Sequence, residues 1–274
     1  MKNIYCLLIV SFLCISSLLP AGAQTLSEKD FQVLNMNDGL SDNDIHSVAK
    51  DTEGFMWFGT GSGLNRYDGR TFKVFRMPGI SYRRIDRVVS LDTDYLLLRS
   101  EQNLFLFDKK YERFLPVCDS VSKQPVMFAD FVADSDGSCW GVSSGELSEV
   151  NFPSSYVQDT AFVSVRHVVN NSQSDPFVVL CMGEDGKMLY CASRNGTVYR
   201  FTPGQRQLKK VCDGQLSSGR WVSSLLNGDS FIWIPTVGDG LYGYDLTNGK
   251  LHHWQYISER MGAVSYTHLR AHET

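Results

Sequence analysis

The chain has 274 residues, of which 43% are hydrophobic and 20% are charged, and its formal net charge is −4 at pH 7. This composition is that of a folded globular protein and excludes a largely disordered one. The mild acidity gives no support for a protein that binds nucleic acid or an anionic membrane surface. The length allows one large β domain or two smaller ones.

Residues 1–23 predict a secretory signal peptide. Lys2 gives a positive start, residues 4–19 are apolar apart from small polar residues, and small residues at 21–23 form a cleavage pattern. The alternative is a transmembrane anchor, but the apolar run is shorter than the roughly 20 residues that such a helix needs. We therefore expect an exported, periplasmic chain whose mature part begins near residue 24.

Strand-like segments recur along the mature chain with a period of 40 to 50 residues. The first unit predicts four strands, at residues 45–50, 55–59, 63–67 and 72–75, with Asp- and Gly-containing turns between them. One large residue marks the second strand of each unit: Trp57, Leu97, Trp140, Tyr190 and Trp233. Four-stranded units at this spacing predict an all-β fold, a β-propeller of about five blades, in which the marked residues wedge between neighbouring sheets. A β-sandwich would explain the strands but not the repeat.

The run Gly39 to Gly69, GLSDNDIHSVAKDTEGFMWFGTGSGLNRYDG, resembles the two-component regulator propeller repeat. The later units are diverged, since Leu97 stands where the repeat has tryptophan, while Trp140 and Trp233 keep that position. The resemblance extends over residues 31–257, strongly in the first unit and by periodicity in the others. The residues that carry it are Gly39, Leu40, Ser41, Asn43, Asp51, Gly54, Trp57, Gly59, Thr60, Gly63, Leu64, Arg66, Tyr67 and Asp68.

This resemblance implies a periplasmic sensor region of the hybrid two-component histidine kinases of Bacteroidetes. Residues 24–257 would then form about five blades of an incomplete ring, which in this family has seven. The resemblance implies an oligosaccharide ligand, a homodimeric parent in the inner membrane and a phosphorelay from a kinase that this sequence does not contain. We therefore expect a chain that is not itself an enzyme. The alternative is a secreted propeller that binds or processes glycans without signalling.

Residues 258–274, which end in SYTHLRAHET, lack the propeller pattern and look like a translated sequencing adapter. We expect this tail to be non-native and the gene to be truncated. A strand is expected at residues 31–36, where it would complete the last blade of the ring. An incomplete ring would expose sheet edges and apolar faces, which favours aggregation.

The glycine-rich segment Gly59 to Leu64 does not fit a nucleotide site. The third glycine of a dinucleotide motif would fall at Leu64, no helix follows, and the lysine of a phosphate-binding loop is absent. His252 and His253 would point to opposite faces of a strand, which disfavours a shared metal ion. Five cysteines remain after the signal peptide without a CxxC pair, and we interpret them as small buried strand residues. We expect no metal and no cofactor.

A propeller binds its ligand at the loops around one mouth, which are the turns between second and third strands and the loops between blades. The polar residues expected there are Arg83, Arg84, Arg99, Arg194 and Asp239. An arginine cluster could hold an acidic sugar through paired hydrogen bonds, although solvated loop charges are the more common outcome. No nucleophile elbow is present, and the 133–140 turn fails the sialidase Asp-box frame, so no catalytic residue is predicted.

Overall fold

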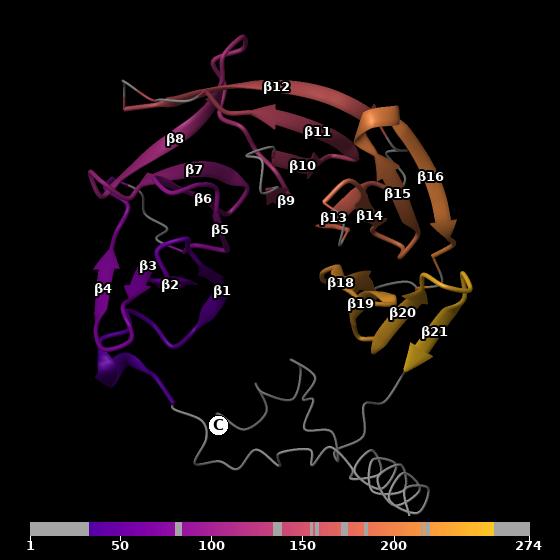
Figure 1. The fold of residues 1–274 in the computed structure, drawn as a ribbon, viewed down its shortest axis with the longest axis horizontal. Helices are drawn as coiled ribbons and strands as arrows, with labels where there is room; N and C mark the ends of the chain where they lie inside the picture. The colour runs from indigo at the N-terminus through magenta and orange to yellow at the C-terminus, as the bar shows by residue number, and fades with distance from the viewer. Residues whose placement is uncertain are drawn as a thin grey trace, which may run out of the picture. The chain divides into compact units, whose positions relative to one another are not determined.

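The computed structural model describes residues 33–79, 84–133, 139–153, 156, 159–170, 175–183, 186–214, 216 and 220–254. The predicted signal peptide, the C-terminal residues expected to be non-native and Arg83 lie outside these ranges. Within them the secondary structure consists of β-strands and two short 3-10 turns, at Met36–Asp38 and Pro203–Gln205. The strands form five blades that follow one another in chain order around an arc (Figure 1). The predicted all-β propeller is confirmed.

Blades 1 and 4 are antiparallel meanders in which each strand pairs with the next along the chain. The four predicted strands of blade 1 are confirmed within one residue at each end. The strands of blade 1 are β1 (Ile45–Lys50), β2 (Met56–Thr60), β3 (Gly63–Tyr67) and β4 (Phe72–Phe75). Those of blade 4 are β13 (Phe177–Met182), β14 (Leu189–Ser193), β15 (Val198–Thr202) and β16 (Gln207–Cys212).

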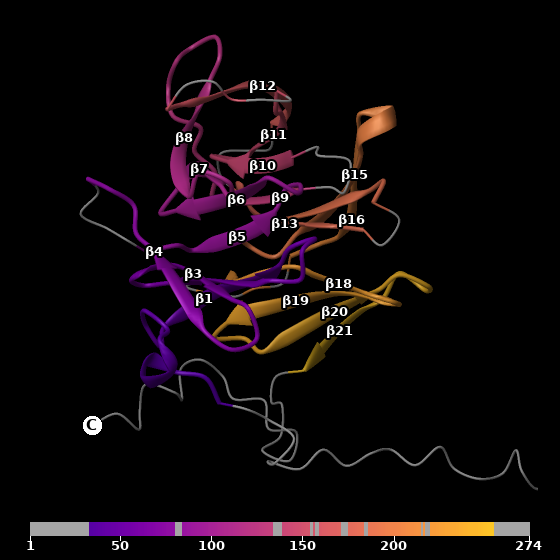
Figure 2. The same ribbon diagram turned by 60° about the vertical axis from the view of Figure 1, so that its left-hand side comes forward.

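Blades 2 and 3 share one eight-stranded sheet, which the repeat did not predict. The outer strands β8 and β12 pair in parallel, with Val117 opposite Ala161 and Asp119 opposite Val163. Figure 2 shows β12 at the outer rim of these blades. Blade 2 contains β5 (Arg87–Ser90), β6 (Tyr95–Ser100), β7 (Asn103–Asp108) and β8 (Arg113–Asp119). Blade 3 contains β9 (Asp130–Ala133), β10 (Cys139–Ser143), β11 (Glu146–Asn151) and β12 (Ala161–Asn170).

Blade 5 differs from the others at its inner edge. Two short segments, β17 (Trp221–Val222) and β18 (Leu226–Gly228), both pair with β19 (Phe231–Val237). Two further strands, β20 (Leu241–Asp245) and β21 (Leu251–Trp254), complete the blade. The inner strand of this blade is therefore interrupted.

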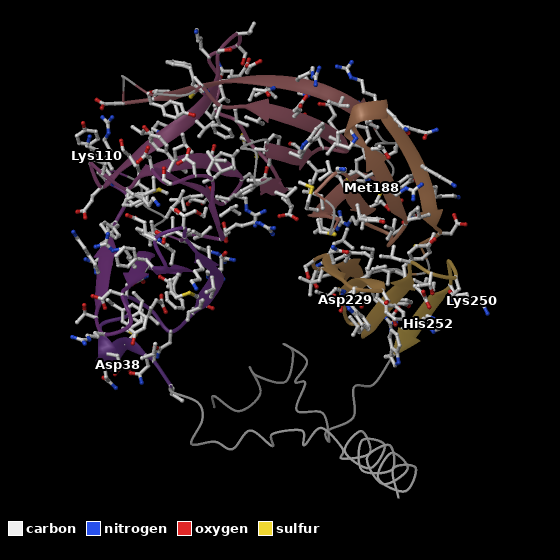
Figure 3. The ribbon with its side chains drawn as sticks, in the orientation of Figure 1. Asp38, Lys110, Met188, Asp229, Lys250 and His252 are labelled. Atoms are coloured by element: carbon white, nitrogen blue, oxygen red, sulfur yellow. The ribbon has the colours of Figure 1, made fainter. Side chains whose placement is uncertain are left out.

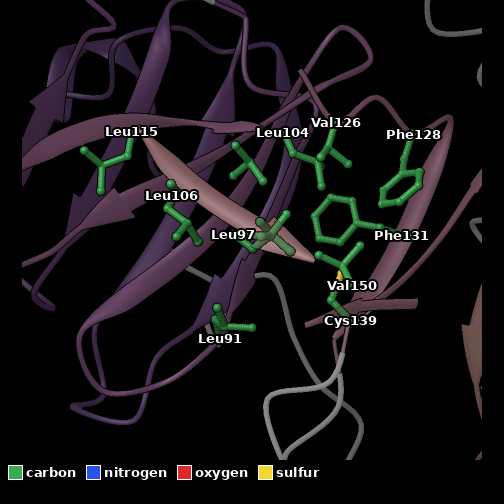
Figure 4. Close-up of a cluster of buried hydrophobic side chains, with 13 residues drawn as sticks. Leu91, Leu97, Leu104, Leu106, Leu115, Val126, Phe128, Phe131, Cys139 and Val150 are labelled. Carbon is green, nitrogen blue, oxygen red and sulfur yellow. The ribbon is translucent and has the colours of Figure 1, made fainter. Parts of the chain in front are cut away.

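Four of the five marked second-strand residues pack toward the following blade. Trp57 is 1% exposed and its ring lies 5.6 Å from that of Phe107 in blade 2. Leu97 belongs to the cluster between blades 2 and 3 that Figure 4 shows. Trp140 lies 5.5 Å from Phe201 of blade 4, between ring centroids. Tyr190 likewise packs in the cluster that blades 4 and 5 share. Burial of one such large side chain contributes about 2–3 kcal/mol.

Trp233 lies on the opposite side of its blade from the residues that face blade 4. Its neighbours Ile232 and Ile234 fill the cluster between blades 4 and 5. Since side chains alternate along a strand, Trp233 points away from that cluster. It packs on Phe231 at 5.0 Å and on Trp254 at 5.5 Å, between ring centroids. No described sheet covers this face, so Trp233 remains partly exposed.

The expected strand at residues 31–36 is wrong over its described part, because residues 33–35 are not in a strand and Met36–Asp38 is a 3-10 turn. The Asn35 side chain accepts a hydrogen bond from the Asn37 amide at 2.8 Å, and the Asp38 carboxylate accepts one from the Asn35 amide at 2.9 Å. This reciprocal capping satisfies the local backbone and competes with strand pairing.

Candidate functional site

The turn between β1 and β2 is organised by the Asp51 carboxylate, which is buried. Asp51 Oδ2 accepts a hydrogen bond from Trp57 Nε1 at 2.8 Å, and Oδ1 accepts the amides of Glu53 and Phe55 at 3.0 Å each. Burial raises the pKa of Asp51, but the Trp57 bond, the Lys109 charge and the two amides together hold it below 3.8. Gly54 completes the turn at φ +93°. One carboxylate therefore caps the turn and orients the tryptophan.

Blade 2 supplies a cation to this carboxylate. Lys109 follows β7, and its Nζ lies 3.5 Å from Asp51 Oδ2 and 3.7 Å from a carboxylate oxygen of Glu53. The Lys109 side chain is only 6% exposed. A second pair, Lys73 with Glu112 at 2.5 Å, joins the same two blades but is exposed. Removing one partner of the buried pair should cost stability because it leaves a buried charge unpaired, whereas the exposed pair should contribute little.

Two of the three glycines in the 59–64 segment lie where another part of the backbone comes close. A Cβ on Gly59 would lie 2.7 Å from the Ile85 carbonyl oxygen, and one on Gly63 would lie 2.7 Å from the Phe75 carbonyl oxygen. Gly63 also has φ +134°, a conformation that favours glycine. Leu64, where a dinucleotide motif would have its third glycine, is fully buried. This geometry gives the segment a structural role.

Tyr67 and Asp68 hold the next turn of blade 1. Asp68 Oδ1 accepts the amides of Arg70 at 2.8 Å and Thr71 at 2.7 Å. The backbone bonds from Thr71 and then Arg70 lower the pKa of Asp68. The Tyr67 ring lies 4.6 Å from that of Phe72. The two aspartates of the repeat motif, Asp51 and Asp68, therefore serve its turns.

Two of the predicted ligand residues, Arg84 and Arg99, come together in blade 2. Arg84 lies just before β5 and donates through Nε to the Asp86 carboxylate. The Asp86 amide donates to the Arg99 carbonyl oxygen at 2.8 Å. Burial lowers the pKa of Arg99, and the charges of Arg87 and Arg84 lower it further, against the opposing effect of Asp130 and Asp86.

The structure adds Arg87 and Asp130 to this group. Arg87 on β5 is directly opposite Arg99 on β6. Its Nη1 lies 3.0 Å from Asp130 Oδ1, and Asp130 Oδ2 accepts the amide of Leu180 at 3.1 Å. Burial raises the pKa of Asp130, while the Arg87 charge opposes that change. The inner strands of blades 2, 3 and 4 thus meet at one carboxylate.

Arg194 and Asp239 lie elsewhere. Arg194 is exposed in the turn between β14 and β15 of blade 4. Asp239 is buried in blade 5, where it pairs with Arg220 and accepts the Tyr242 hydroxyl at 2.8 Å. Burial, that hydrogen bond and the Asp239 charge raise the pKa of Tyr242 to about 12. Among the described residues, no hydrogen bond or ion pair joins Arg194 or Asp239 to Arg84 or Arg99.

The two adjacent histidines of β21 point to opposite faces, as predicted. His253 stacks on Tyr242 at 4.0 Å between ring centroids. His252, which Figure 3 labels, lies 5.8 Å from Phe231 between ring centroids. No group of three or more His, Cys, Asp or Glu side chains in the described part of the chain is arranged to hold a metal ion. The five described cysteines are free thiols, and burial raises the pKa of Cys181 to about 12.

A small cavity lies between blades 4 and 5, beside Tyr242, with a volume of about 10 Å³. A volume of this size is about that needed by one water molecule. None of the helices in the described ranges is long and apolar enough to cross a bilayer.

Sequence comparisons identify relatives over part of the chain. The family model described as "Two component regulator propeller" matches residues 39–62. A curated protein, histidine kinase P4 of Formosa agariphila, is 38% identical over 78 residues. That alignment covers 28% of this chain and 5% of the kinase, so the chain spans a small part of that relative.

Comparisons with solved structures show the propeller fold. The extracellular domain of a hybrid two component system from B. thetaiotaomicron aligns with a TM-score of 0.59 at 17% identity, over 81% of this chain and 31% of that one. A β-propeller domain, Cps50 from Myceliophteria thermophila, aligns with 0.56 at 13% identity, over 76% and 72% of the two chains. A catalytically inactive virginiamycin B lyase from Staphylococcus aureus aligns with 0.55 at 11% identity, over 83% and 74%.

Proposed function

We propose that this chain is a sensor region of a hybrid two-component protein in the periplasm. The proposal starts from the two-component regulator propeller repeat in blade 1, which confirms the resemblance predicted from the sequence. The match to residues 39–62 carries this proposal. The 38% identity to a histidine kinase over 78 residues supports it. A regulator propeller also accords with the prediction that the chain is not itself an enzyme.

The ligand that we propose is an oligosaccharide. The guanidinium groups of Arg84, Arg87 and Arg99 gather at the inner part of blade 2, and Arg84 and Arg87 remain partly exposed. Guanidinium groups donate several hydrogen bonds in a fixed geometry, which suits sugar hydroxyl and carboxylate oxygens. This gathering supports a site in the propeller itself.

Signalling requires that the ligand favour one arrangement of the parent over another. A ligand that binds both arrangements equally would shift nothing, however tightly it binds. We propose that the parent is a homodimer in which occupancy changes how the propellers are arranged, and that the kinase and its phosphorelay respond. Blades 2 and 3 would move as one body, because β8 and β12 join them in one sheet.

Two experiments test this proposal. The full chain, screened on an array of oligosaccharides and then measured by calorimetry, should bind one glycan class saturably. Sequencing the genomic locus beyond codon 257 should reveal further blades, a membrane helix and a kinase. A stop codon soon after ring closure would contradict the signalling role and would favour a secreted glycan-binding propeller. Absence of binding to every glycan would contradict the oligosaccharide ligand.

A further inference from the structure

The inner part of blade 2 holds more positive charge than its carboxylates neutralise. Arg87 and Arg99 are directly opposite each other on β5 and β6, with Arg84 beside them. Like charges at directly opposed strand positions destabilise a sheet. Asp86 pairs with Arg84 and Asp130 pairs with Arg87, so the third guanidinium is left over.

Arg99 is that remaining guanidinium. It forms no ion pair with any residue that the structure describes, and its buried Nε has no hydrogen-bond partner. Burial lowers its pKa, which reflects the cost of holding this charge away from water. An unsatisfied buried donor costs stability. Natural proteins retain such local costs chiefly at functional sites.

The neighbouring groups hold the arginines in place before any ligand arrives. Asp130 fixes Arg87 at 3.0 Å and is itself held by the Leu180 amide at 3.1 Å. The Arg87 Cζ atom also lies 5.6 Å from the centroid of the Phe131 ring. A guanidinium that is already oriented loses less freedom when it binds a ligand.

We propose that Arg99, Arg87 and Arg84 form a carboxylate-binding site, and that its ligand is a uronic-acid unit of an oligosaccharide. The planar fork of a guanidinium matches a planar carboxylate in a two-bond geometry. The site lies beside Asp130, where blades 2, 3 and 4 meet, so occupancy would act on three blades. The sugar part of this assignment rests on the proposed function, whereas the carboxylate part rests on the arginines.

The test measures by calorimetry how tightly the full chain binds two trimers, one of α-1,4-linked galacturonic acid and one of galactose. The acidic trimer should bind more tightly than the neutral one. The variant Arg99→Gln should weaken the acidic trimer by roughly 10- to 100-fold, the range expected for lost charge-assisted hydrogen bonds. It should leave the melting temperature unchanged or higher, because Arg99 forms no ion pair with a described residue and its buried Nε has no hydrogen-bond partner. Arg87→Gln should weaken binding in the same direction, whereas Arg70→Gln, at an exposed turn position in blade 1, should not.

The outcomes separate this site from the sensor function. If a neutral sugar binds and Arg99→Gln leaves every affinity unchanged, the carboxylate site is wrong while the sensor function stands. If Arg99→Gln lowers the melting temperature and weakens both trimers alike, Arg99 is structural and the site is also wrong. A sulfated trimer that binds more tightly than the carboxylated one would overturn the choice of ligand. Loss of acidic-trimer binding in Arg99→Gln at an intact melting temperature would establish the site, whatever the genomic locus encodes downstream.

Discussion

Blades 1 and 5 carry tryptophan at the same place on their second strands and use it differently. Trp57 is 1% exposed, donates to the buried Asp51 carboxylate and packs on Phe107 of the next blade. No described sheet covers the face of blade 5 on which Trp233 lies, and its ring packs on Phe231 and Trp254 of its own blade. The turn before Trp233 carries Asp229, which is exposed. The same residue type is thus a buried wedge in one blade and part of an open face in the other.

This difference shows that the wedge works only through a neighbour. In a repeat architecture each unit is stabilised by its own contacts and by the interface with the next unit. Asp51 gives Trp57 a partner within blade 1, and Lys109 and Phe107 extend the contacts into blade 2. Blade 5 has no buried carboxylate in the turn before Trp233 and no described sheet after it. Its tryptophan should therefore contribute much less to the stability of the chain.

The largest expected difference in folding stability is between variants of the two tryptophans. Trp57→Ala should lower the free energy of unfolding by about 3–5 kcal/mol, because it leaves a cavity between blades 1 and 2. Trp233→Ala should cost about 1 kcal/mol or less, because its ring is already partly exposed. Urea unfolding of the full chain, followed by fluorescence and circular dichroism, measures both. Equal losses in the two variants would show that the faces of blades 1 and 5 are equally covered.

The next effect concerns the carboxylate that links blades 1 and 2. Asp51→Asn should lower the free energy of unfolding by about 2–4 kcal/mol, because it leaves the buried Lys109 ammonium with only the exposed Glu53 carboxylate as counter-charge. Glu112→Gln, which breaks the exposed pair with Lys73, should cost about 0.5 kcal/mol. The same urea titration compares the two variants. A smaller loss for Asp51→Asn than for Glu112→Gln would refute the link.

A smaller difference in stability is expected between alanine variants of two glycines, Gly59 and Gly243. Gly59→Ala places a methyl group 2.7 Å from the Ile85 carbonyl oxygen, which is backbone, and should cost about 1–3 kcal/mol. Gly243→Ala meets the Trp254 and Trp233 rings at 2.9 and 3.1 Å on the open face of blade 5. Those side chains can move, so its loss should be under about 1 kcal/mol. The melting temperatures of both variants measure these losses. A larger loss of stability in Gly243→Ala than in Gly59→Ala would mean that the open face of blade 5 is rigidly packed.

The smallest expected effect is a change in the stability of the fold with pH. The folded-state pKa of Asp51 lies below its ordinary value of 3.8, so its contribution to stability is present above that value and is lost as the pH falls through the folded pKa. The stability difference between the natural chain and Asp51→Asn should therefore shrink below about pH 4. Urea midpoints at pH 6, 4 and 3 measure this change. A difference that stays constant over this range would show that folding does not lower the pKa of Asp51.

The candidate site was only partly predictable from the sequence. Arg84 and Arg99 were expected at the mouth of the propeller because both lie near turns of blade 2. Arg87 and Asp130 were missed, since both are strand residues without a motif. They become neighbours only through the register of β5 with β6 and the approach of β9 to β5. Asp239 was expected as a ligand residue, yet its carboxylate bonds within blade 5, to Arg220 and Tyr242.

The sequence by itself determined the four-stranded units, their turns and the residue that marks each second strand. These features depend on short-range chemistry, such as the Asp51 carboxylate accepting amides two and four residues further along the chain. The tertiary structure decided which sheets share an interface, the parallel pairing of β8 with β12, and the meeting of Lys109 with Asp51. Those contacts join residues tens of positions apart whose partners depend on how each sheet twists and stacks. That is why blades 1 and 5 place the same tryptophan in different surroundings.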